Sequence, residues 1–167
     1  MKRVFSTLLI LWAMLLILAS NPVAQDLKMP VDFYLGVGTS VPTGDFANGR
    51  KFGIHGLARI GYSVTPKFDV LAGIEVYALR DDRSDSTGGP FSIIDFVGDL
   101  KVNFGTPGLN FNPFLLGGAG VSHSSLFLLE AGGGVEFNKF FAQIKYINMF
   151  RESGSYTIIP FTLGVKF

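Results

Sequence analysis

Cysteine is absent from this chain of 167 residues, and tryptophan and histidine nearly so, with one Trp and two His. Without cysteine there is no disulfide, no thiol nucleophile and no thiolate ligand for a metal. His55 and His123 are too few for a metal site built on imidazoles, and we expect neither a metal nor a cofactor. Charged residues make up 16% of the chain and the formal net charge is +1. This balance leaves no basic patch for a nucleic-acid partner.

A hydrophobic run long enough to cross a membrane as a helix is also missing. The main apolar run, Leu8–Leu18, is shorter than the roughly 20 residues that a spanning helix needs. Lys2 and Arg3 precede it, and small and turn-prone residues follow it, in the order typical of a secretory signal peptide. We predict a cleaved signal peptide over residues 1–24, with a retained N-terminal anchor helix as the alternative. Its removal changes the formal net charge from +1 to −1 and takes away the single tryptophan, Trp12.

Glycine and phenylalanine, by contrast, are abundant. Residues 25–167 hold all 21 glycines and all but one of the 17 phenylalanines. No charge run or low-complexity tract divides this part, so we predict a single domain over residues 25–167. From residue 32 onward apolar residues recur with a period of two, which is the period of a β-strand. Eight such segments occur, at residues 32–41, 52–64, 68–78, 94–104, 111–121, 127–137, 140–150 and 156–167.

The two faces of these segments differ in charge. One face carries no Asp, Glu, Lys or Arg in any segment, whereas the other carries nearly every charge that lies within a strand. Hydrocarbon requires an uncharged outer face, because Arg or Lys at the bilayer midplane costs roughly 2–4 kcal/mol. The segments also have about the length that a tilted strand needs to cross a bilayer. We therefore predict an all-β fold, namely an eight-stranded antiparallel up-and-down transmembrane β-barrel.

The charged face would line the lumen of this barrel. The predicted charge network consists of Arg59, Glu75, Asp95, Asp99, Lys101, Glu130 and Lys145. The interior of an eight-stranded barrel is just wide enough to be filled by side chains, so we expect these charges to pair into a plug. A narrow pore for small polar solutes is the alternative, because several lumen-facing glycines leave space. Those glycines could equally make room for Arg59 and Phe114.

A soluble lipocalin-like carrier is a further alternative. It would explain why several positions on the charged face are apolar, namely Leu57, Leu71, Phe114, Leu116 and Phe141. A soluble barrel, however, would place its charges toward water and its apolar face inside. The Gly-x-Trp expected near the start of a lipocalin is also missing from residues 25–167.

Connections between the segments alternate in length. Residues 65–67, 105–110 and 138–139 are predicted turns, and residues 42–51, 80–90, 122–126 and 151–155 are mostly longer polar loops. Short periplasmic turns and longer external loops are typical of outer-membrane barrels, as are aromatic girdles at both interfaces. The predicted periplasmic girdle is Tyr62, Phe68, Phe104, Phe111, Phe137, Phe140 and Phe167. The predicted outer girdle is Phe52, Phe91, Phe127 and Phe150.

The last segment, with Phe161, Leu163, Val165 and a terminal Phe167, resembles the assembly signal of outer-membrane proteins. Residues 36–46 and 112–121 resemble the first strand and a middle strand of the OmpA/OmpX-like outer membrane protein β-barrel domain family. The resemblance covers the chain from about residue 31 to its end. It implies a location in the bacterial outer membrane, and as partners the outer-membrane lipids, the insertion machinery and periplasmic chaperones. It implies no catalytic residues, because the family shares none.

The function that we expect is non-enzymatic: a structural, adhesive or interaction role of a monomer through its external loops. A lipid A deacylase-like enzyme is the remaining alternative, because His123, Ser124 and Ser125 precede Glu130 and Glu136, and acyl transfer uses a serine, a histidine base and an orienting acid. The His-x-Ser-Asn motif of those enzymes, however, lies shortly before the final strand. Residues 146–150 occupy that place here and contain neither His nor Ser.

Overall fold

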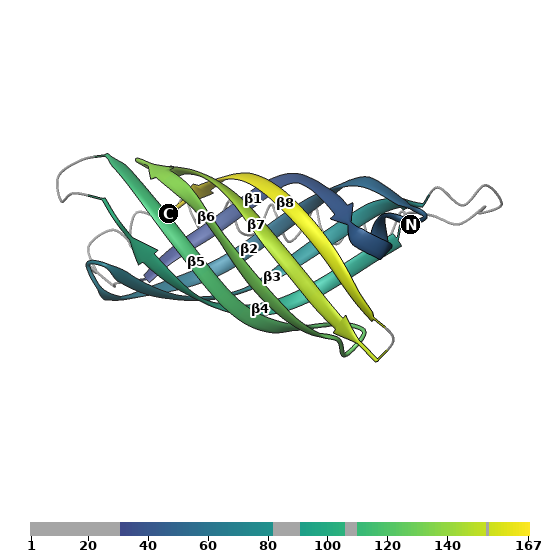
Figure 1. Ribbon diagram of the computed structural model, residues 1–167. Coiled ribbons are helices and arrows are strands. Elements are labelled where there is room, and N and C mark those ends of the chain that lie inside the picture. The colour runs from purple at the N-terminus through teal and green to yellow at the C-terminus, as the bar shows by residue number, and fades with distance from the viewer. Residues whose placement is uncertain (1–30, 82–90, 106–109, 153) are drawn as a thin grey trace, which may run out of the picture. The chain divides into compact units, whose positions relative to one another are not determined.

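The computed structural model describes residues 31–81, 91–105, 110–152 and 154–167. These residues form a closed barrel of eight antiparallel strands, which confirms the predicted fold class (Figure 1). The strands are β1 (Val31–Thr43), β2 (Arg50–Thr65), β3 (Phe68–Asp81), β4 (Phe91–Asn103), β5 (Phe111–Ser122), β6 (Phe127–Phe137), β7 (Phe140–Arg151) and β8 (Gly154–Lys166). The predicted signal peptide lies outside the described residues.

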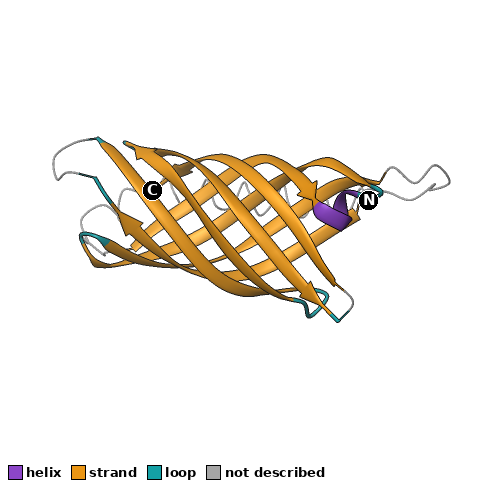
Figure 2. Cartoon of the chain, in the orientation of Figure 1, coloured by secondary structure: helices purple, strands orange, loops and turns teal. Residues whose placement is uncertain are grey.

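Each strand pairs with the next one along the chain, and β8 pairs with β1 to close the barrel. The strands run obliquely to the barrel axis (Figure 2). A short 3-10 helix, η2 (Gly44–Ala47), lies between β1 and β2. The pairing of β7 with β8 is interrupted between the pairs Ile144–Phe161 and Ile147–Ile158. Pro160 lies in this gap and has no backbone N–H to donate. No helix among the described residues is long and apolar enough to cross a membrane.

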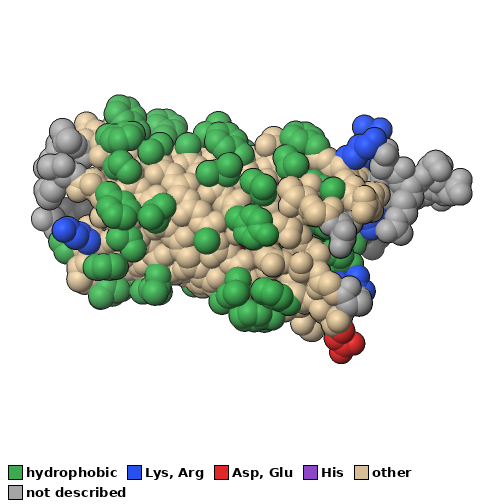
Figure 3. Space-filling view, viewed as in Figure 1, with side chains coloured by type: hydrophobic (Ala, Val, Ile, Leu, Met, Phe, Trp, Pro, Cys, Tyr) green, Lys and Arg blue, Asp and Glu red, His purple; other side chains and the backbone are tan. Residues whose placement is uncertain are grey.

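The outer wall of the barrel is apolar. Most large apolar side chains on the face predicted to be uncharged are exposed, including Ile54 (65%), Leu100 (63%) and Ile144 (54%). In Figure 3 apolar side chains are scattered over the wall, while the charged ones on that face lie at its two ends. Lys51 and Arg80, directly opposite each other on β2 and β3, are such end positions. The predicted assignment of residues to the two faces is therefore confirmed.

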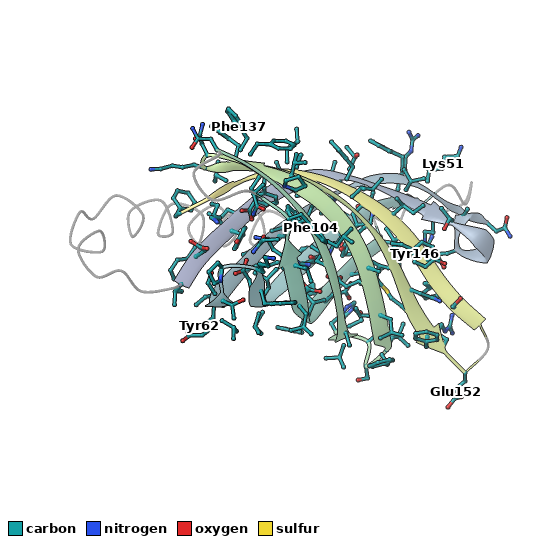
Figure 4. The ribbon with its side chains drawn as sticks, turned by 60° about the vertical axis from the view of Figure 1, so that its left-hand side comes forward. Lys51, Tyr62, Phe104, Phe137, Tyr146 and Glu152 are labelled. Atoms are coloured by element: carbon teal, nitrogen blue, oxygen red, sulfur yellow. The ribbon has the colours of Figure 1, made fainter. Side chains whose placement is uncertain are left out.

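Exposed aromatic residues lie at the strand ends. Tyr62 and Phe137 project near one end of the barrel, and Lys51 and Glu152 lie near the other (Figure 4). Phe104 is exposed directly after the last residue of β4. The remaining members of the predicted periplasmic girdle are also exposed, as are Phe52, Phe127 and Phe150 of the predicted outer girdle.

The assignment of Phe91 to the outer girdle is wrong. Phe91 has the same parity as the buried Ile93 and therefore faces the lumen, where it packs against the buried apolar cluster. The ring of Phe91 packs edge-on against that of Phe46 of η2, with the two ring centroids 5.9 Å apart. β4 begins three residues before the predicted segment, at Phe91 instead of residue 94. The alternation of inward and outward side chains continues through these residues, so Phe91 points inward.

Candidate functional site

The barrel lumen contains a buried cluster of charged side chains around Arg59 of β2. The Arg59 guanidinium bridges three strands: it pairs with Glu75, lies 2.6 Å from Asp99 Oδ2, and lies 2.7 Å from Glu130 Oε1. Lys145 approaches from β7, with Nζ 2.5 Å from Glu75 and 3.0 Å from Glu130. All five side chains are buried. We call this group the Arg59 cluster.

Glycines on neighbouring strands make room for this cluster. A Cβ added to Gly73 would collide with the side chain of Arg59, and one added to Gly132 would lie 2.8 Å from Lys145 Cγ. A Cβ on Gly134 would lie 2.7 Å from Phe114 Cζ. The space that glycine leaves is therefore occupied by neighbouring side chains. The pore alternative depended on that space being open.

A second charged group lies around Lys101 of β4. Lys101 Nζ pairs with Glu136, lies 3.1 Å from Asp69 Oδ2, and donates to the Tyr34 hydroxyl at 3.1 Å. Lys166 joins through Glu136, at 3.2 Å, and reaches Asp32 at 3.3 Å. We call the group of these charged residues, Asp32, Asp69, Lys101, Glu136 and Lys166, the Lys101 cluster.

Apolar layers alternate with the charged ones along the lumen. The inward residues of β3 run from Asp69 in the Lys101 cluster, through Leu71, to Glu75 in the Arg59 cluster, and then to Tyr77 and Leu79. Leu71 belongs to a first apolar group, and Tyr77 and Leu79 belong to a second. The first group is Tyr34, Leu57, Leu71 and Phe141. The second is Phe46, Tyr77, Leu79, Ile93, Val97, Leu128, Ile147, Met149 and Ile158, here called the outer apolar cluster.

Little free space remains between the two charged clusters. A cavity lined by residues of both, and by Leu57, Leu71 and Phe141, has a volume of about 10 Å³. That is about the space one water molecule requires. Beyond the Arg59 cluster, six fully buried apolar or aromatic side chains of the outer apolar cluster fill the cross-section, namely Tyr77, Leu79, Leu128, Ile147, Met149 and Ile158. The lumen is therefore a packed interior.

His55 is part of this interior. Its Nδ1 and Nε2 atoms lie 3.0 Å from the Ser40 hydroxyl and 2.9 Å from the Thr162 hydroxyl. Its ring stacks on Tyr77, with centroids 5.4 Å apart. Both ring nitrogens thus have neutral partners from β1 and β8. Among the described residues, no group of His, Asp and Glu is arranged to hold a metal.

The predicted charge network divides differently in the structure. Arg59, Glu75, Asp99, Glu130 and Lys145 meet in one cluster, whereas Lys101 belongs to the other. Asp95 is buried and lies opposite Glu75 in the pairing of β3 with β4. Within the described part of the chain it joins no ion pair. The sequence prediction also missed the lumen partners of Lys101. These partners are Asp69 and Glu136, and Lys166 and Asp32 join the cluster through Glu136 and Lys166. All four have the same inward parity as the predicted residues, which could have indicated them.

The serine and histidine of the enzyme alternative lie in an exposed turn. The backbone N–H of Ile94 donates to Nδ1 of His123 at 3.2 Å, so a neutral ring carries its proton on Nε2. Nε2 is 3.3 Å from the Ser124 hydroxyl. A base that activates serine needs a deprotonated Nε2. Glu130 and Glu136, the proposed acids, lie in the two lumen clusters instead. The geometry therefore lacks the serine–histidine–acid arrangement.

Three residues of the predicted assembly signal, Phe161, Leu163 and Val165, lie on the outward-facing side of β8, and Phe167 follows the end of that strand. Phe161, Leu163 and Phe167 are exposed, and Val165 is half-buried. Their recognition by an insertion machinery stays a prediction.

Comparisons with known proteins agree with this architecture. No protein-family model and no curated protein matches the chain. Among solved structures, Neisserial surface protein A matches with a TM-score of 0.64 and 12% identity, over 82% of this chain and 96% of that one. The N-terminal β-barrel domain of Pseudomonas aeruginosa OprF matches with a TM-score of 0.54 and 18% identity, over 83% and 98%. Ail, the attachment invasion locus protein of Yersinia pestis, matches with 0.52 and 15%, over 82% and 97%. The chain therefore has the eight-stranded fold of small outer-membrane β-barrels of the OmpA/OmpX-like type.

Proposed function

We propose that this protein is an integral outer-membrane barrel, exported with a cleaved signal peptide, whose closed lumen serves as a scaffold. The observation that carries the proposal is the inside-out distribution of polarity. Charges are buried in the lumen, while large apolar side chains cover the wall. Soluble monomers rarely expose a continuous apolar patch of more than a few hundred Å². A lipid bilayer is the environment that such a wall requires.

The same distribution opposes conduction and enzymatic turnover. Ion pairs and apolar side chains fill the lumen, and the serine–histidine pair lacks the arrangement of a catalytic base. We therefore assign the protein a structural or interaction role as a monomer, exercised at its external end. The resemblance to Ail, an attachment protein by its name, favours adhesion among such roles. Outer-membrane lipids, the insertion machinery and periplasmic chaperones are its proposed partners.

Cell fractionation and gel migration test this proposal. The full chain, expressed in a bacterium with two membranes, should be recovered from the outer membrane without residues 1–24. Unheated protein should migrate differently from heated protein on detergent gels. Recovery as a soluble periplasmic monomer without detergent would contradict the membrane assignment. Attachment to host cells by bacteria that express the chain would separate an adhesive role from a purely structural one.

A further inference from the structure

A pocket of about 320 Å³ opens at the end of the barrel beyond the outer apolar cluster. Its lining comes from β4, β5, β7, β8 and the turn between β5 and β6. The residues are Phe91, Ile93, Ser122, Ser124, Leu126, Met149, Arg151 and Tyr156. The volume is at the small end of the range of about 300–1,000 Å³ typical of ligand sites. We call this cavity the mouth pocket.

The base of the mouth pocket is apolar and closed. Ile93 and Met149 are buried and belong to the outer apolar cluster. Phe91, Leu126 and Tyr156 are partly buried and pack against the same cluster. A molecule in this pocket therefore meets a packed floor, so it enters and leaves through the same opening. An apolar base of this kind favours an alkyl chain over a sugar or a hydrated ion.

The polar groups of the pocket favour a negative charge. Among its described lining residues Arg151 is the one charged side chain, and no carboxylate is present. The guanidinium lies 5.1 Å from the centre of the Tyr156 ring and donates to the Tyr156 hydroxyl. Arg50, which does not line the pocket, lies with its guanidinium 4.4 Å from the centre of the Phe91 ring. The cation that the pocket itself presents is therefore Arg151.

We propose that the mouth pocket binds a single-chain amphiphile with an anionic head group, such as an alkyl carboxylate. The alkyl chain packs on the partly buried Phe91, Leu126 and Tyr156, directly above Ile93 and Met149. The carboxylate pairs with Arg151, whose planar guanidinium matches a carboxylate in geometry. The pocket opens at the end of the barrel that we propose to be external, so the ligand reaches it from the external medium; this step rests on the proposed function. This binding function is additional to the scaffold role.

Methyl NMR of methionine provides a local test. In a chain without residues 1–24 the methionines are Met29 and Met149. Protein labelled with ¹³C at the methionine methyl groups would be placed in zwitterionic lipid nanodiscs and titrated with sodium octanoate. The Met149 signal should shift in a saturable way, while the Met29 signal should not. Octyltrimethylammonium, with a chain of equal length and opposite charge, should bind at least ten times more weakly.

Three variants separate specific binding from partition into lipid. Arg151→Gln should weaken octanoate binding at least tenfold, and Leu126→Trp, which fills the pocket, should abolish it. Arg80→Gln removes an exposed cation from β3 outside the pocket and should leave the affinity unchanged. Equal shifts of both methionine signals, equal affinities for the two probes, or an unaltered affinity in Arg151→Gln would each overturn the proposal. Folding of each variant is checked by its migration on unheated gels.

Discussion

Replacement of Arg59 by methionine is the sharpest test of the packed lumen. The substitution keeps most of the side-chain volume and removes the cation that Glu75, Asp99 and Glu130 share. Glu75 and Glu130 retain Lys145 as a partner. Asp99 has no other ion pair among the described residues. Asp99 is therefore left buried without an ion-pair partner, and the expected loss of folding free energy is about 3–5 kcal/mol.

A double-mutant cycle identifies the origin of this loss. If the stranded charge of Asp99 causes it, Asp99→Asn in the Arg59→Met background should recover most of the stability. Lys139→Met, in the exposed turn between β6 and β7, serves as the matched control and should change stability by less than about 0.5 kcal/mol. The assay is reversible urea unfolding in lipid vesicles. A loss below about 1 kcal/mol in Arg59→Met, with no gain from Asp99→Asn, would show that water screens the cluster and would refute the packed lumen.

Three further predictions address the wall, the glycines and conduction. Ile144→Arg should reduce the free energy of folding into bilayers by about 2–4 kcal/mol if the residue lies near the midplane. Glu152→Arg, in the exposed turn after β7, should be nearly silent, and equal tolerance of both would contradict the assignment of the wall. Gly73→Ala should destabilise the barrel by about 1–3 kcal/mol in urea unfolding, because the added Cβ would collide with the Arg59 side chain. Gly98→Ala should cost much less, because the atom nearest to its added Cβ is 3.9 Å away. Similar losses in the two variants would argue against close packing around Arg59. Purified protein in planar bilayers should show no steady conductance, and sustained channel openings would restore the pore.

The fold was predictable because the side-chain alternation of a strand is strict. A period of two placed the residues of each strand on the correct face, and the absence of charge on one face indicated the hydrocarbon. Predictions failed where the segments were drawn too short. β4 begins at Phe91, so the inward position of that residue follows from the same alternation once the strand is extended.

The composition of the lumen clusters was harder to predict, because it depends on register. Asp99 and Lys101 are consecutive inward residues of β4, yet they belong to different clusters. Lys101 lies opposite Asp69 on β3. Residues 82–90 separate β3 from β4, and a connection of that length does not fix register as a two-residue hairpin does. The alternation therefore indicates which residues face inward but not which of them meet.

The need to specify strand register explains why charged side chains are present in the barrel interior. Buried ion pairs are weak evidence for stability, because desolvation offsets much of their attraction. Their geometry, however, is specific: Arg59 of β2 reaches carboxylates on β3, β4 and β6, and Lys145 of β7 reaches two of the same groups. A slip of one residue between any two of these strands would move a charge from the lumen to the lipid. A slip of two residues would keep the charges in the lumen but would separate Arg59 from its carboxylates. The Arg59 cluster thus opposes both kinds of slip among β2, β3, β4, β6 and β7, whereas an apolar filling would tolerate a slip of two residues.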